Sequence, residues 1–96
     1  MSNFNIERCD QLFDAILRLK SREDCRKFFE DVCTINELQA LTQRLEVAQL
    51  LKVGKNYQEI SKTTGASTAT ISRVNKCLLY GDGGYELVLQ TKSEGK

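Results

Sequence analysis

The 96-residue sequence contains no proline, no histidine and no tryptophan. Without proline, the chain lacks the commonest helix breaker, and helix-favouring Leu, Glu, Lys, Gln, Arg and Ala recur throughout. Without histidine, the usual general base near neutral pH is missing, and no glycine-rich phosphate loop replaces it. The composition therefore predicts an all-α fold and argues against an enzyme, so no catalytic residue is assigned.

The sequence also lacks metal-binding cysteine spacing and long apolar runs. Its four cysteines show no C-x-x-C pattern, so we predict no metal site and interpret them as small buried or half-buried thiols in a reducing compartment: Cys9, Cys25, Cys33 and Cys77. No apolar run approaches the roughly 20 residues that span a bilayer, and the N-terminus does not resemble a signal peptide. We therefore expect a cytoplasmic protein without a membrane partner.

Positive charge is concentrated in one part of the chain. The whole sequence carries a net charge of +1, but residues 52–76 carry +4 and residues 1–51 carry −2. A basic segment of this kind suits a phosphate-binding face, although a solvated helical face gives the same pattern. With 41% apolar and 28% charged residues, the chain is typical of one globular domain, residues 1–96.

Apolar spacing predicts three helices in the first half of the chain. The first covers residues 6–20, the second follows a cap at Ser21, and the third covers residues 35–53 after a capping box from Thr34 to Glu37. The third helix is apolar over a broad surface. One apolar stripe consists of Leu38, Leu41, Leu45 and Ala48, and three further apolar residues widen it: Val47, Leu50 and Leu51. Two short helices do not cover so much surface from one side, so we expect residues 1–53 to form a homodimer, although packing within one chain could cover part of this surface.

The second half of the chain has the pattern of a helix-turn-helix over residues 57–79. A helix over residues 57–64 is capped by Asn56 and Glu59, and a helix over 68–79 is capped by Ser67. A loop at 81–84 follows, and then a helix over 85–90 that is predicted to pack Leu87 and Val88 or Leu89 against the rest of the domain. Residues 91–96 are predicted to form a frayed tail. Gly54 and Gly65 stand where left-handed backbone is expected.

The residues around Gly65 satisfy the packing demands of a helix-turn-helix. Two short helices that cross steeply need apolar residues in the angle between them: Ile60, Ala66, Ile71 and Val74. Ser61 is small enough for the crossing point. A plain helical corner in an all-α domain could share some of these features, but the combination with local positive charge favours DNA binding.

The helix over 68–79 is predicted to enter the major groove with its N-terminus toward the bases. Thr68 and Thr70 can hydrogen bond to base edges, the Ala69 methyl can contact a thymine methyl, and basic residues can contact phosphates. The predicted DNA-binding residues are Gln58, Ser61, Lys62, Ser67, Thr68, Ala69, Thr70, Ser72, Arg73 and Lys76. The predicted partners are double-stranded DNA and a second copy of the chain.

Two stretches of this sequence, Leu41-x-x-Arg44 and Gly65-Ala66-x-x-Ala69-Thr70-Ile71-x-Arg73, resemble the tryptophan repressor family, in particular its YerC/YecD-type branch. The resemblance implies a six-helix domain in an intertwined homodimer, a transcriptional repressor whose reading heads meet half-sites about one DNA turn apart, roughly 34 Å. It also implies a corepressor pocket at Thr34, Arg44 and Arg73. In the family, two arginines there sandwich an indole ring.

This chain departs from the family at two positions of that pocket. Val74 stands where the repressors have a glycine, and Cys77 replaces a serine. A branched side chain takes up room that a ligand needs, so the departures argue against tryptophan as the ligand. No cofactor is assigned, although the resemblance leaves room for an amino-acid corepressor. The sequence is also compatible with a dimeric protein-interaction module of little DNA affinity, and with a regulator controlled by a small molecule different from tryptophan.

Overall fold

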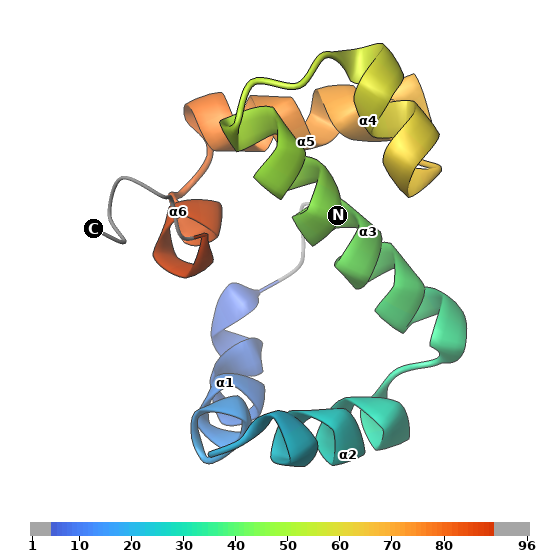
Figure 1. The fold of residues 1–96 in the computed structure, drawn as a ribbon. Helices are drawn as coiled ribbons and strands as arrows, with labels where there is room; N and C mark the ends of the chain where they lie inside the picture. The colour runs from blue at the N-terminus through green and yellow to red at the C-terminus, as the bar shows by residue number, and fades with distance from the viewer. Residues whose placement is uncertain (1–4, 90–96) are drawn as a thin grey trace, which may run out of the picture. The chain divides into compact units, whose positions relative to one another are not determined.

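The computed structural model describes residues 5–89, and helices are the only regular elements in that range. In chain order they are the 3-10 helix η1 Ile6–Cys9 and the α-helices α1 Asp10–Leu17, α2 Arg22–Val32, α3 Ile35–Lys52, α4 Tyr57–Thr64, α5 Thr68–Tyr80 and α6 Gly84–Val88 (Figure 1). The all-α prediction is confirmed. The chain divides into two compact units, residues 1–38 and 39–96.

The first helix is shorter and less regular than the sequence predicts. Asn5 caps a 3-10 turn, with its Oδ1 accepting from the backbone N–H of Glu7 at 3.0 Å, and the α-helix proper begins only at Asp10. The predicted end at Lys20 is also wrong. The backbone N–H of Lys20 donates to Asp24 Oδ2 at 2.9 Å, so this residue belongs to the cap of the next helix.

The predicted caps of α2 and α3 are both present. Ser21 Oγ accepts from the backbone N–H of Asp24 at 3.0 Å. Thr34 Oγ1 accepts from the N–H of Glu37 at 3.0 Å, and Glu37 Oε1 accepts from the N–H of Thr34 at 2.8 Å, which completes a capping box. Neither α1 nor α2 contains a buried residue, so a single copy of the chain builds no apolar core around these helices.

The apolar core lies in the second unit and holds α3, α4 and α5 together (Figure 1). Its buried members are Val47, Ala48, Ile60, Ala66, Ile71, Val74 and Leu89. Three of them, Ile60, Ile71 and Val47, are fully buried and large, so each anchors its helix to the other two. The core therefore fixes the two helices of the predicted helix-turn-helix against the C-terminal half of α3.

Both ends of the connection from α3 to α4 are capped. After α3, Gly54 adopts a φ of +90°, its N–H donates to the carbonyl of Leu51, and the N–H of Lys55 donates to the carbonyl of Leu50 at 3.0 Å. This pair of hydrogen bonds is a Schellman motif, which requires left-handed backbone at the glycine. At the start of α4, Asn56 and Glu59 form a full capping box. The short connection is therefore well defined.

Several side chains differ from the sequence predictions. The last helix ends at Val88, and its side chains at Leu87 and Val88 are 86% and 66% exposed, because Leu89 and the half-buried Tyr85 make the contacts with the core. All four cysteines are free thiols, but Cys25 and Cys77 are exposed instead of buried. Gln90 and the predicted tail at 91–96 lie outside the described residues.

Candidate nucleic-acid interface

The turn between α4 and α5 is held by side-chain hydrogen bonds as well as by its glycine. Gly65 has a φ of +79°, a conformation in which a side chain would be strained, and its N–H donates to the carbonyl of Ser61 at 2.8 Å. The Ser61 hydroxyl donates to the carbonyl of Ala66 at 2.8 Å. Thr64 Oγ1 donates to the carbonyl of Ile60 at 2.7 Å and accepts from the N–H of Ala66 at 3.1 Å. These bonds set the angle at which α5 leaves α4.

A side chain from α3 also contacts this turn. Gln43 Nε2 donates to the backbone carbonyl of Thr64 at 3.1 Å, and both groups are partly buried. The carbonyl belongs to the last residue of α4, where helical carbonyls have no partner within the helix. Gln43 therefore links the turn directly to the long helix of the same unit.

The N-terminus of α5 is capped and its inner face is anchored. Ser67 Oγ accepts from the N–H of Thr70 at 3.1 Å and donates to Thr70 Oγ1 at 3.2 Å. Ile71 and Val74 are buried on the inner face, at 0% and 2% exposure. The first turn of α5 is consequently presented in a fixed orientation, with Thr68 and Ala69 exposed at its tip.

The outer face of α5 is a continuous exposed stripe. Its members follow the spacing i, i+3, i+4 and i+7, which places them on one side of the helix: Ala69, Ser72, Arg73 and Lys76. The stripe begins with a small residue at the helix N-terminus and ends with two cations. It contains no acidic side chain, so its surroundings favour an anionic partner.

The predicted contact residues of α4 differ in how far their side chains are exposed. Gln58 and Lys62 are exposed, whereas Ser61 is half-buried and its hydroxyl proton is used within the turn. Thr70 on α5 is also half-buried, and its hydroxyl accepts from Ser67. Ser61 and Thr70 are thus predicted contact residues whose hydroxyls already serve the fold.

The residues of the predicted corepressor pocket do not share one environment. Thr34 belongs to the capping box of α3, Val74 is part of the core, and Arg44, Arg73 and Cys77 are exposed. Burial raises the pKa of the half-buried Tyr85 above its usual value of 10.0; electrostatic interaction with Cys77 raises this pKa further, and the positive charge of Arg44 lowers it. Tyr85 of α6 is therefore within electrostatic range of both Arg44 and Cys77.

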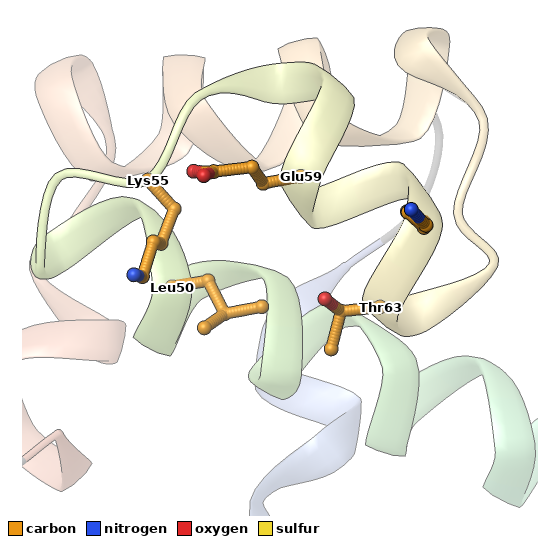
Figure 2. Close-up of a pocket in the computed structure, with 5 residues that line it drawn as sticks. Leu50, Lys55, Glu59 and Thr63 are labelled. Carbon is orange, nitrogen blue, oxygen red and sulfur yellow. The ribbon is translucent and has the colours of Figure 1, made fainter.

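Sequence reasoning missed three residues at or beside this interface. Gln43 gives no signal in the sequence, because a polar residue on a long helix looks like any solvated position. Thr64 beside a glycine is typical of a side chain that caps a turn, and this signal could have found it. Lys55 follows a helix-ending glycine, and it lines a surface cavity with Leu50, Glu59, Lys62 and Thr63 (Figure 2).

Over the part of the chain that the structure describes, no helix is long and apolar enough to cross a membrane.

Comparison with known proteins matches residues 7–93 to the model of the Trp repressor protein family. A relative is the uncharacterised protein YerC of Bacillus subtilis (strain 168), with 58% identity over 85 residues that cover 88% of this chain and 82% of YerC. A crystal structure of a candidate Trp repressor from Staphylococcus aureus superimposes with a TM-score of 0.83 and 49% identity, covering 91% and 92% of the two chains.

A TrpR-like protein from Eubacterium eligens ATCC 27750 gives a TM-score of 0.82 with 55% identity, covering 85% of this chain and 84% of that protein. The family model spans almost the whole sequence, and both solved structures share the helical fold of this chain. The family is one of DNA-binding regulators, which agrees with the exposed and basic outer face of α5. The chain therefore belongs to the Trp repressor family, as a relative of YerC.

Proposed function

We propose that this protein is a sequence-specific transcriptional repressor that binds double-stranded DNA as a homodimer. The N-terminal turn of α5 enters the major groove, where Thr68 and Ala69 meet base edges. Arg73 and Lys76 on the same helix, together with Gln58 and Lys62 on α4, contact the phosphate backbone and set the register.

One observation carries this proposal. The inner face of α5 packs in the core through Ile71 and Val74. The opposite face is exposed and carries small side chains near its N-terminus and basic side chains toward its C-terminus. Small residues at the tip allow close approach to base pairs, and cations further along reach the flanking phosphates. A helix that served only as a corner in the fold would not require this division between its two ends.

The apolar surface of the N-terminal helices supports the homodimer. Leu12 and Phe13 of α1 are 43% and 44% exposed, and Leu41 and Leu45 of α3 are 46% and 37% exposed. Each of the two units thus exposes large apolar side chains on its own surface, and exposed apolar patches are typical of protein interfaces. A second copy supplies the missing core and also provides the second reading head that a near-palindromic operator needs.

The DNA interface is tested by charge reversal on α5. Arg73→Glu should weaken retention of a random-sequence duplex pool by at least about tenfold, because it replaces a phosphate contact with repulsion. The matched control is Arg26→Glu, which makes the same charge change at an exposed position of α2 and should retain wild-type affinity. Equal retention by both folded variants would contradict the DNA interface and favour a dimeric protein-interaction module.

We also propose that this regulator does not use tryptophan as its corepressor. Val74 fills core space at 2% exposure, where the family leaves room for a ligand. DNA affinity should be unchanged by tryptophan at millimolar concentration, whereas a tryptophan-dependent increase would contradict this proposal. An amino acid of another kind, or a different small molecule, is then the effector to look for.

A further inference from the structure

A cavity of about 200 Å³ lies on the second unit, between the C-terminal end of α3 and helix α4. Its lining side chains are Leu50, Lys55, Glu59, Lys62 and Thr63, and four of them are labelled in Figure 2. The volume is smaller than the roughly 300–1,000 Å³ of sites for drug-sized molecules. A ligand that fits this cavity is therefore smaller than a drug-sized molecule.

The walls of the cavity are fixed by the two capping motifs that flank the connection. The Schellman motif places Lys55 directly beside Leu50 through the hydrogen bond between their backbones. Glu59, Lys62 and Thr63 follow the spacing i, i+3 and i+4, so they share one face of α4, away from the buried Ile60. The side chains thus come from backbone segments that are held in place before any ligand arrives.

The charge of the cavity favours an anion. It contains two lysines and one glutamate, and neither lysine takes part in the two ion pairs found among residues 5–89, Lys27–Glu23 and Lys52–Glu86. Glu59 Oε1 already accepts from the backbone N–H of Asn56 at 3.3 Å, so the carboxylate is oriented by the cap. Among residues 5–89, its second oxygen and the Thr63 hydroxyl accept or donate no side-chain hydrogen bond, and both can bind a neutral polar group.

We propose that this cavity binds a small phosphate monoester that also carries a hydroxyl group. The phosphate lies between the ammonium groups of Lys55 and Lys62, where two cations match its charge. The ligand hydroxyl donates to Glu59, and the short carbon chain packs on Leu50. The site shares no residue with the predicted corepressor pocket.

Binding at this site has a defined consequence for DNA, which rests on the proposed function. Lys62 is one of the predicted phosphate contacts of the DNA interface, and a ligand phosphate neutralises it. The phosphate monoester therefore lowers DNA affinity, and DNA lowers the affinity for the monoester by the same factor. The site acts as an inducer site on the first helix of the helix-turn-helix.

The test begins without DNA, so that it does not depend on the DNA interface. Glycerol 3-phosphate is titrated into the isotope-labelled full chain at low salt, and amide chemical shifts are followed by NMR. We expect saturable shifts confined to residues near 50–63. Lys55→Gln should weaken binding about tenfold or more, while Lys20→Gln, the same charge change at an exposed lysine outside this cavity and the DNA interface, leaves it unchanged. Circular dichroism and the thermal midpoint establish that both variants are folded.

Three results would overturn the proposal. The first is shifts at all lysines without saturation, and the second is equal binding by Lys55→Gln and the wild type. The third is protection of this cavity by a DNA duplex with no binding of glycerol 3-phosphate, which would make the cavity a site for a backbone phosphate. Glycerol and inorganic phosphate are the two partial probes, and each should bind more weakly than the ester that combines them.

Discussion

Gln43 and Thr64 are 21 residues apart in the sequence, yet the Gln43 side-chain amide donates to the Thr64 carbonyl at 3.1 Å. This bond joins the middle of α3 to the last residue of α4, just before the glycine of the turn. The helix-turn-helix of α4 and α5 is therefore attached to α3 in two ways, by the apolar core between the helices and by this one hydrogen bond beside the turn.

Gln43→Ala should lower the free energy of unfolding by about 1–2 kcal/mol, because it leaves a partly buried carbonyl without its partner. The measurement is urea-induced unfolding at neutral pH. Gln49→Ala, on the exposed surface of the same helix, is the matched control and should change stability by less than about 0.5 kcal/mol. The same loss in both variants would show that the bond adds nothing specific.

Gly65→Ala should be destabilising by roughly 1–2 kcal/mol, because a φ of +79° strains any residue with a Cβ. Space is not the limiting factor, since the nearest atom to an added Cβ would be Gln43 Nε2 at 3.9 Å. Gly84→Ala makes the same chemical change at a position of α6 without a positive φ and should be neutral or slightly stabilising. Thermal unfolding of the two variants decides between strain and crowding, and a stable Gly65→Ala would refute the strain.

Tyr85 should make the fold sensitive to alkaline pH. Burial raises its pKa above 10.0 in the folded state, so the folded protein holds this proton more tightly than the unfolded chain does. The resulting stabilisation is fully present below the unfolded pKa and is lost as the pH rises through the folded value. Stability should therefore fall above a pH of about 10.

The Tyr85 prediction is measured by urea unfolding at a series of pH values on the wild type and on Tyr85→Phe. The variant should lose the part of the alkaline decline that Tyr85 causes. Tyr80→Phe removes a phenol that is 80% exposed and should keep the wild-type pH profile. An unchanged profile in Tyr85→Phe would mean that the phenol is not buried in solution.

Leu12→Glu should weaken the homodimer, since it places a charge in the apolar surface that a second copy covers. Sedimentation equilibrium should show a dissociation constant raised by at least about tenfold, and the thermal midpoint should be lower than that of the wild type at the same protein concentration. Gln11→Glu introduces the same charge at the neighbouring exposed position of α1 and should remain dimeric. A monomeric wild type would contradict the proposed dimer itself.

The sequence predicts the second unit more accurately than the first. Helix bounds at 57–64 and the caps at Asn56 and Ser67 are correct because they depend on local signals, a capping side chain and a glycine. The first helix is predicted too long at both ends. At its start the backbone N–H of Glu7 donates to the side chain of Asn5, and at its end the N–H of Lys20 donates to the side chain of Asp24, so neither group continues the α-helix. Local competition of this kind is invisible to a periodicity argument.

The candidate DNA interface and the cavity also divide into features that local sequence signals predict and features that depend on tertiary packing. The exposed stripe on α5 follows from helical spacing alone, and the residues of that stripe are all among the predicted contacts. The contact of Gln43 with Thr64 depends on tertiary packing and could not be predicted from either residue. The cavity at Lys55 depends on the course of the chain between two caps, which the sequence indicates only as a short loop.

The most direct test of the account is selection of random duplex DNA on the purified protein at near-physiological salt, in parallel with the variant Thr68→Val. The wild type should enrich a near-palindromic sequence with half-sites about one helical turn apart, without added tryptophan. Thr68→Val should alter the preference at a single position of each half-site. Failure of the folded, dimeric wild type to enrich any sequence, or the same enriched sequence from both proteins, would contradict base recognition by the N-terminus of α5.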